Sequence, residues 1–153
     1  MKIEKIEKYM LNIFKSFFFN KDSIIYISKE KKLFYTGTFF IFLSTFINYS
    51  INVNNVHVFL LQTAVIIGIL FIFHFAAKYL FKGKSRIENY YTAASNMFLL
   101  YLLTLIPLEI FNIIIGLWVY VLNLYIIYIL HKISKLKTIV IGLIPIILFI
   151  ILI

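Results

Sequence analysis

The residues of this chain that could do chemistry are few, and its histidines are the first of them because imidazole binds metals and moves protons near neutral pH. His74 and His131 lie near the same end of two apolar segments, so they could meet. Two imidazoles could ligate a haem iron or supply half of a zinc site. The chain has no cysteine, and no carboxylate is in helical register with either histidine. We therefore interpret both as structural or interfacial residues and expect no metal and no cofactor.

Other enzyme chemistry lacks its partners in this sequence. Ser95 or Ser134 could pair with His74 as nucleophile and base, but no acid is available to orient the imidazole. Segment 82–85 (KGKS) is like the end of a phosphate-binding loop, yet the earlier glycine and the preceding strand are missing. Glu109 follows a proline in a turn between apolar segments, so we interpret it as a solvated turn residue. We expect no enzyme activity.

Polar side chains within the apolar segments are the remaining candidates, because a polar group is costly to bury in lipid. The candidate intramembrane polar cluster consists of Gln62, His74, Asn96 and Asn123. For the three amides two interpretations stay open: hydrogen bonds between helices, or the lining of a polar cavity. Small residues that would let helices approach closely are Ala64, Gly68, Gly116 and Gly142.

Helices that cross a bilayer are the elements that must position these residues. Of the 153 residues 63% are hydrophobic and 14% are charged, whereas soluble domains are about 45–50% apolar. A soluble fold of this size could not hide so much apolar surface. An apolar helix needs about 20 residues to cross the hydrocarbon core. Five segments reach or approach this length, at about 33–51, 56–80, 90–106, 113–130 and 138–153.

The lysine and arginine residues lie in every other gap between these segments. The residues before the first segment and the gaps at 78–89 and 131–137 are basic, and the gaps at 52–55 and 107–112 contain no lysine or arginine. Short basic loops stay on the cytoplasmic side of a bilayer. The alternation therefore predicts a multi-pass membrane protein with the N-terminus in the cytoplasm and the C-terminus outside. The many Lys, Ile, Asn and Phe residues suggest a prokaryotic cell membrane.

The first 32 residues form the largest predicted piece outside the membrane. Their apolar positions recur at spacings of three and four: Ile3, Ile6, Met10, Ile13, Phe14 and Phe17. Lysines occupy the other faces, which predicts a basic amphipathic helix that either lies flat on the headgroups or docks on the ends of the spans. After a turn at 20–22, Asp22 or Ser23 could cap a second short helix. The predicted fold is thus an all-α integral membrane protein, with a cytoplasmic amphipathic lead-in at 1–32 and a five-span domain at 33–153.

The formal net charge of +9 is explained by this topology and by contact with anionic lipid headgroups, so we expect no nucleic-acid partner. A lysine or arginine near an anionic leaflet gains about 1 kcal/mol. The predicted headgroup contacts are Lys2, Lys5, Lys8, Lys82, Lys84, Arg86, Lys132, Lys135 and Lys137. Tyrosines predicted at the cytoplasmic rim, with their hydroxyls in water, are Tyr35, Tyr90, Tyr91 and Tyr128.

Several stretches resemble the Yip-one domain family, the Ypt/Rab-interacting membrane proteins and their prokaryotic relatives. They are 17–37, 76–98 (AAKYLFKGKSRIENYYTAASNMF), 100–107 (LYLLTLIP) and 112–147, in which a basic His/Ser/Lys loop leads into a last span that contains a proline. The resemblance implies five spans and a cytoplasmic N-terminus. Eukaryotic members contact small GTPases through a long N-terminal region and an acidic-tyrosine-proline motif. This chain lacks both, and it has Lys21 where the family often has proline, so the GTPase role does not carry over.

These observations lead to one hypothesis and one alternative. The hypothesis is a non-catalytic multi-span membrane protein that organises the bilayer or recruits a partner through its basic cytoplasmic face. The partner would be another membrane protein or a second copy of this chain. The alternative is a small transporter, channel or immunity-type subunit whose polar cavity is lined by Gln62, Asn96 and Asn123.

Overall fold

The computed structural model describes residues 2–52, 56–105 and 109–152, with side chains at 4–47, 57–104, 110–147 and 150. The described residues form, in order, α1 (Lys2–Ser16), α2 (Lys21–Lys29), α3 (Lys32–Asn52), α4 (Val56–Phe75), the π-helical η1 (Ala76–Leu80), α5 (Ile87–Asn96), the 3₁₀-helical η2 (Met97–Leu105), α6 (Glu109–His131) and α7 (Lys135–Leu152). Each predicted apolar segment is a helix, which confirms the helical class. Ile106 and Ile153, the predicted ends of two spans, lie outside the described residues.

Two stretches of the described chain are long and apolar enough to cross a bilayer, His57–Leu80 and Ile110–His131. A third apolar stretch, Lys32–Ile47, is shorter. Only 22% of the most apolar window of the first stretch and 33% of that of the second are buried within the molecule. Neither window is mostly buried within the molecule, unlike the core helix of a soluble domain.

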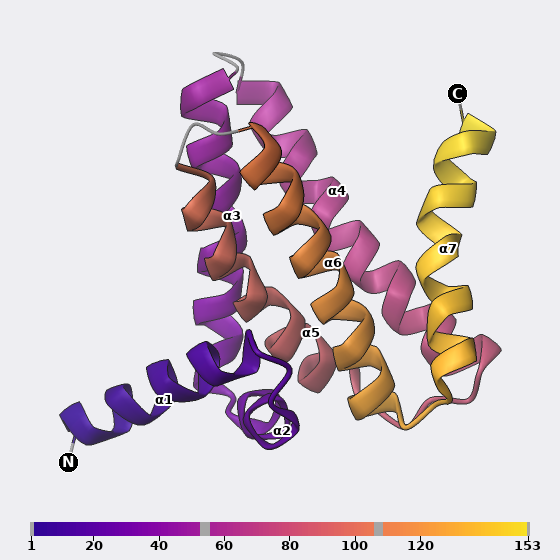
Figure 1. Cartoon of the computed structure of the whole chain (residues 1–153), viewed down its shortest axis with the longest axis horizontal. Coiled ribbons are helices and arrows are strands. Elements are labelled where there is room, and N and C mark those ends of the chain that lie inside the picture. The colour runs from indigo at the N-terminus through magenta and orange to yellow at the C-terminus, as the bar shows by residue number, and fades with distance from the viewer. Residues whose placement is uncertain (1, 53–55, 106–108, 153) are drawn as a thin grey trace.

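The long helices stand side by side, and the first two helices lie across one end of them (Figure 1). That end also carries the loops at 81–86 and 132–134, and we name it the basic end. The last turn of α3 and the first turn of α6 lie at the opposite, far end (Figure 1). Helix α7 stands apart from the other long helices over much of its length and contains Pro145. Both basic loops thus lie at the same end of the molecule as α1 and α2 (Figure 1).

Helix α5 is the centre of the bundle. Its residues from Tyr90 to Asn96 are all buried. Helix α3 crosses it closely at Gly37, where an added Cβ atom would collide with the Ser95 hydroxyl and lie 2.8 Å from Nδ2 of Asn96. The helix of the predicted third span begins at Ile87, three residues before the predicted start at Tyr90. It continues after α5 as the 3₁₀ helix η2.

Hydroxyl groups join α3 to its neighbours at two levels. Oγ1 of Thr38 lies 3.2 Å from the Tyr91 hydroxyl on α5, and Oγ1 of Thr45 lies 2.9 Å from Oγ1 of Thr63 on α4. Such bonds fix helix orientation where both neighbours are apolar. The threonines carried no signal in the sequence analysis, because threonine is common in helices of every kind. Tyr91 was predicted at a wet rim, and this prediction is wrong because its side chain is buried between helices.

The glycines predicted to allow close approach behave differently from one another. Gly142 does so: Leu124 and the Tyr120 hydroxyl would lie 3.0 Å from an added Cβ atom. At Gly68 such an atom would meet nothing within 4 Å. The pair formed by Ala64 and Gly68 therefore does not join two helices of this chain, because it lies on an open side of α4.

The turn between α1 and α2 corrects the predicted cap. Asn20, rather than Asp22 or Ser23, is the N-cap of α2, and its side-chain oxygen accepts a hydrogen bond from the Ser23 amide at 2.9 Å. Asparagine is among the best N-cap residues because its short side chain satisfies a free N–H of the first turn. Phe19, just before it, has a φ of 58°, which turns the chain back from α1 into α2.

Candidate functional site

The apolar face predicted for α1 divides between two surroundings. Ile13 and Phe17 are buried against the bundle, whereas Ile6 and Phe14 are each 60% exposed and Met10 is 49% exposed. Docking on the bundle, one of the two interpretations of this helix, describes its C-terminal part, and contact with headgroups stays a prediction. The preceding turns extend away from the bundle (Figure 1), and their apolar side chains are uncovered. The side chains of Lys2 and Ile3 lie outside the described residues.

Trp118 fixes the docked end of α1, a role that the sequence analysis did not find. Its indole Nε1 donates a hydrogen bond to the Phe17 carbonyl at 3.0 Å. The Phe19 ring packs edge-on against Trp118 and Tyr125, each with a centroid distance of 5.3 Å. The sequence alone does not reveal this hydrogen bond, because Phe17 lies about a hundred residues before Trp118.

Lys5, Lys8 and Lys15 of α1 are exposed, and two of them lie over tyrosine rings. Nζ of Lys5 is 5.4 Å from the Tyr9 ring centroid, and Nζ of Lys8 is 5.3 Å from that of Tyr26. The Tyr9 hydroxyl and then the Glu30 carboxylate raise the pKa of the Lys5 ammonium above its ordinary value. Lys5 is therefore positively charged at every physiological pH.

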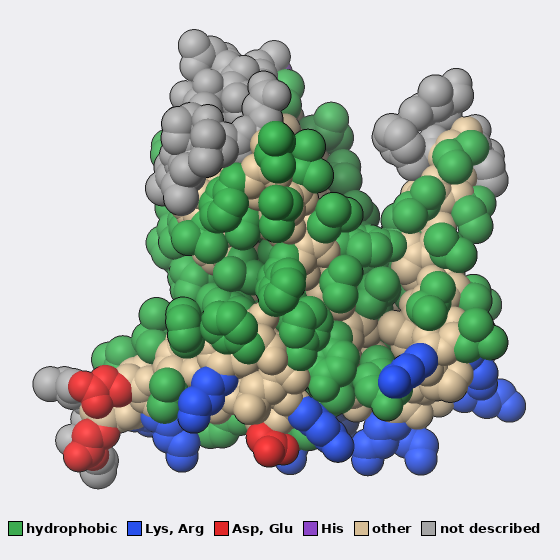
Figure 2. Space-filling model, viewed as in Figure 1, with side chains coloured by type: hydrophobic (Ala, Val, Ile, Leu, Met, Phe, Trp, Pro, Cys, Tyr) green, Lys and Arg blue, Asp and Glu red, His purple; other side chains and the backbone are tan. Residues whose placement is uncertain are grey.

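The other predicted headgroup contacts gather at the basic end. Figure 2 shows the lysine and arginine side chains along this end of the molecule, with apolar side chains covering the flanks above it. The predicted contacts whose side chains the structure describes are all exposed: Lys5, Lys8, Lys82, Lys84, Arg86, Lys132, Lys135 and Lys137. The predicted residues thus share one face, as a single leaflet would require.

The loop at 81–86 is hydrogen-bonded to the end of α6 and to η1. The Lys84 amide donates to the His131 carbonyl at 3.1 Å, and the Gly83 amide donates to the Ala77 carbonyl at 2.9 Å. Lys82 and Lys132 have φ values of 55° and 54°, which turn the chain sharply at each loop. A Cβ atom on Gly83 would lie 2.8 Å from the Ala77 carbonyl oxygen, so this position requires glycine.

Beneath these loops His74 and His131 do meet. Their ring centroids are 5.0 Å apart, and the Tyr90 ring lies 5.8 Å from the first and 5.9 Å from the second. All three side chains are 1% exposed. Tyr90 is therefore buried, which corrects its predicted place at a wet rim: it comes from the first turn of α5, the most enclosed helix.

Polar atoms of this buried trio lack partners. Within the described part of the chain, the Tyr90 hydroxyl, Nδ1 of His74 and both ring nitrogens of His131 make no hydrogen bond. Two imidazoles supply two metal ligands, and no group of three histidine, cysteine or acidic side chains arranged to hold a metal ion occurs among the described residues. The arrangement packs the ends of α4, α5 and α6 together.

Two amides of the predicted polar cluster, those of Asn96 and Asn123, make separate hydrogen bonds. Nδ2 of Asn96 donates to the Leu33 carbonyl of α3 at 2.9 Å and to Thr92 of its own helix. Nδ2 of Asn123 donates to Val119, four residues back in α6. No hydrogen bond or ring contact joins His74, Asn96 and Asn123 in the described structure. Asn96 therefore makes a bond between helices, and Asn123 makes a bond within one.

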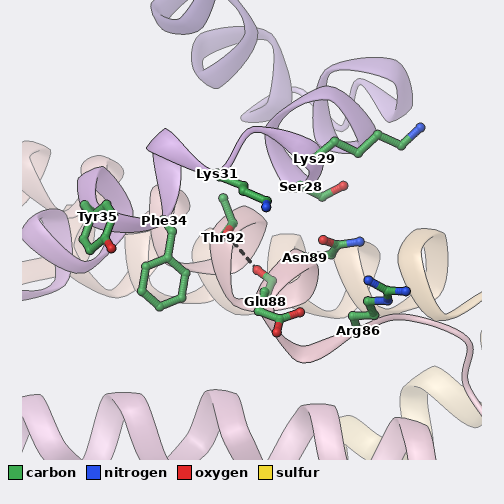
Figure 3. A pocket seen from close by; sticks show the side chains of 9 residues that line it. All are labelled: Ser28, Lys29, Lys31, Phe34, Tyr35, Arg86, Glu88, Asn89 and Thr92. Atoms are coloured by element: carbon green, nitrogen blue, oxygen red, sulfur yellow. Dashed lines mark hydrogen bonds between the residues drawn. The ribbon is translucent and has the colours of Figure 1, made fainter.

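A cavity at the basic end contains residues that the sequence analysis had not grouped. It has a volume of about 540 Å³ and lies where α2, the start of α3 and the start of α5 meet (Figure 3). Its lining residues are Ser28, Lys29, Lys31, Phe34, Tyr35, Arg86, Glu88, Asn89 and Thr92. The basic run SKEKK at 28–32, just before the first apolar segment, was the available signal. Gln62, Asn96 and Asn123 do not line this cavity.

Fold and site together define a class: a helical protein with outward-facing apolar helices and one basic end. Comparison with protein-family models, with curated proteins and with solved structures finds no match to this chain. The resemblance to the Yip-one domain family therefore stays a prediction.

Proposed function

We propose that this chain is a non-catalytic, multi-span membrane protein that binds an anionic leaflet through its basic end and α1. It would thereby organise the bilayer or present its basic face to a membrane-protein partner. The observation that carries the proposal is the separation of charge from apolar surface. Exposed lysine and arginine side chains lie at one end, and exposed apolar side chains cover the flanks (Figure 2).

The flanks support a position in lipid rather than in water. Leu61 on α4 is 65% exposed, Leu117 on α6 is 61% exposed and Ile139 on α7 is 55% exposed. Monomeric soluble proteins rarely expose contiguous apolar patches larger than a few hundred Å², so exposed apolar side chains along whole helices indicate a membrane. The described residues of these helices contain few charges away from their ends.

The lengths of α3 and of α5 together with η2 support crossings beyond the two stretches that meet the criterion of length and composition. The hydrocarbon core is about 30 Å thick, and the α-helical rise makes the 21 residues of α3 about 31 Å long. Helices α5 and η2 have 10 and 9 residues. Because a 3₁₀ helix rises about 2.0 Å per residue, they reach about 33 Å together. The 3₁₀ segment lengthens a span that would otherwise be marginal.

The proposed orientation follows from where the basic loops lie. Helices α1 and α2 and both basic loops share the basic end, which we assign to the cytoplasm of a prokaryotic cell. The C-terminal end of α7 lies at the far end (Figure 1), which we assign to the outside. In this orientation the uncovered apolar residues of α1 meet the cytoplasmic leaflet at headgroup depth, and its lysines stay in the phosphate layer.

A spin label on α1 tests the proposal. The chain has no cysteine, so Leu11→Cys, at a position 51% exposed, takes a single nitroxide. In vesicles of phosphatidylcholine with phosphatidylglycerol we expect the label to be immersed. Removing two charges with Lys5→Gln and Lys8→Gln costs about 2 kcal/mol of surface binding and should return the label to water. Lys132→Gln with Lys135→Gln is the matched control and should leave it immersed.

Two results would contradict the proposal. A label that stays in water in both neutral and anionic vesicles would show that α1 does not bind the bilayer. Solute flux through the reconstituted protein would favour the transporter or channel alternative instead.

A further inference from the structure

The cavity at the basic end has the position and size of a ligand site. Its walls come from the end of α2 and the first turn of α3, which follow each other in the chain, and from the first turns of α5, which is distant in the sequence (Figure 3). A volume of about 540 Å³ is within the range of pockets that hold small ligands. Because α3 begins here and becomes apolar immediately afterwards, the cavity lies at a boundary between polar and apolar surface.

The charges that line the cavity leave it suited to an anion. Lys29, Lys31 and Arg86 face one carboxylate, Glu88, which leaves an excess of two positive charges. No ion pair within the described part of the chain neutralises any of the three cations. Figure 3 shows the charged ends of Lys31 and Arg86 extending toward Asn89 from two sides, while Lys29 extends outward.

Neutral hydrogen-bonding groups complete the polar wall. The Asn89 amide makes no hydrogen bond to any described residue, so its two N–H groups are available to a ligand. The hydroxyls of Ser28 and Thr92 already donate to the carbonyls of Ile25 and Glu88, which leaves them as acceptors. Two cations and a primary amide around one space match the oxygens of a phosphate group.

The other wall is aromatic and continues outside the cavity. The Phe34 ring lies 5.0 Å from that of Tyr91, and Tyr91 lies 6.4 Å from Phe71 on α4. Phe71 then stacks on Phe75, and these two side chains are 39% and 46% exposed. An exposed apolar band therefore begins beside the polar cavity, which is the arrangement that a phosphate attached to acyl chains requires.

We propose that this cavity binds the phosphate of an anionic phospholipid, with Lys31, Arg86 and Asn89 as its donors. An anionic phospholipid and a soluble metabolite could both present a phosphate ester to these donors. We favour the lipid because the exposed aromatic band beside the cavity could hold its acyl chains. This inference rests on the proposed function, because it needs the basic end to face a leaflet. It adds one defined site to a surface that otherwise attracts lipid by charge alone.

Glu88 gives the proposal a test of opposite sign. Its carboxylate repels a phosphate, so Glu88→Gln should strengthen lipid binding, whereas Lys31→Gln and Arg86→Gln should weaken it. Lys135→Gln with Lys137→Gln removes the same charge from the same face outside the cavity and is the matched control. A structural effect would not move binding in both directions according to the sign of the charge removed.

The experiment measures lipid retention by native mass spectrometry on the full chain in neutral detergent, titrated with phosphatidylglycerol and with phosphatidylcholine. We expect one phosphatidylglycerol to be retained in preference to phosphatidylcholine. The double variant at Lys31 and Arg86 should weaken its binding about tenfold or more, and Glu88→Gln should strengthen it about threefold. The control double variant should change it less than twofold.

A competition with soluble glycerol 3-phosphate separates the two sources of the phosphate ester. Weak competition supports the lipid, and competition at equal concentration overturns the lipid assignment in favour of a soluble ester. Equal weakening by the pocket and control variants would overturn the pocket and leave the proposed function intact. A lack of preference for phosphatidylglycerol, together with a wet label on α1, would overturn both.

Discussion

Helices α5 and α7 show how differently two apolar segments of one chain can be placed. Helix α5 is buried from Tyr90 to Asn96, whereas in α7 Leu136 is 72% exposed and Ile150 is 69% exposed. Yet α7 is by far the more apolar sequence, and α5 contains threonine, serine, asparagine and small alanines. In water the more apolar segment would be the core. Here the order is reversed.

The reversal is what a lipid environment would produce. Lipid chains are as apolar as leucine, so nothing drives a leucine-rich helix into the centre of a bundle. Polar and small residues gain most from the interior, because they find hydrogen bonds and close contacts there. The polar and small residues that open α5 are therefore the feature that suits it to the centre.

Among the substitutions that test the central place of α5, we expect the largest loss of stability at Gly37. An alanine there would push its methyl group into the Ser95 hydroxyl and Asn96, which separates α3 from α5. We expect Gly37→Ala to lower the free energy of unfolding by about 1–3 kcal/mol, measured by titration into denaturing detergent. Gly68→Ala is the matched control, because its Cβ atom meets nothing; it should be neutral or stabilising. Equal losses at both positions would contradict the account.

Asparagine substitutions sharpen the comparison with a smaller effect. Asn96→Leu removes the hydrogen bond to Leu33 and should cost about 1–2 kcal/mol in the same titration. Asn123→Leu removes only a bond within α6 and a buried oxygen that has no partner in the described structure. We expect it to change the free energy by less than about 0.5 kcal/mol. A larger loss of stability for Asn123→Leu than for Asn96→Leu would contradict the central place of α5 and favour α6.

Much of the helical fold could be predicted, because long apolar runs and charged gaps are local features. The places of individual side chains depend on pairing between distant segments. His74 and His131 were predicted to be able to meet, since both lie near one end of their helices. The burial of Tyr90 and the bond from Trp118 to Phe17 depend instead on which helices become neighbours. Lys31 and Arg86 line one cavity for the same reason, and their spacing in the sequence does not predict it.

The smallest expected effect concerns the attachment of α7. The Tyr120 hydroxyl donates a hydrogen bond to the Gly142 carbonyl, which joins α6 to α7. Tyr120→Phe should lower stability by only about 0.5–1 kcal/mol. It should also speed deuterium exchange in α7 while exchange in α5 stays unchanged. Faster exchange in both helices would mean that α7 belongs to the same cooperative unit as the centre.

Labelling of single cysteines from one side of the membrane tests the central claim most directly. Lys82→Cys and Lys135→Cys place a thiol on each basic loop, and Ile110→Cys places one at the far end, where the native side chain is 76% exposed. In intact cells an impermeant maleimide should label only Ile110→Cys, and both loop positions should react after permeabilisation. Labelling of either loop position in intact cells, or recovery of the chain in solution without detergent, would contradict the account.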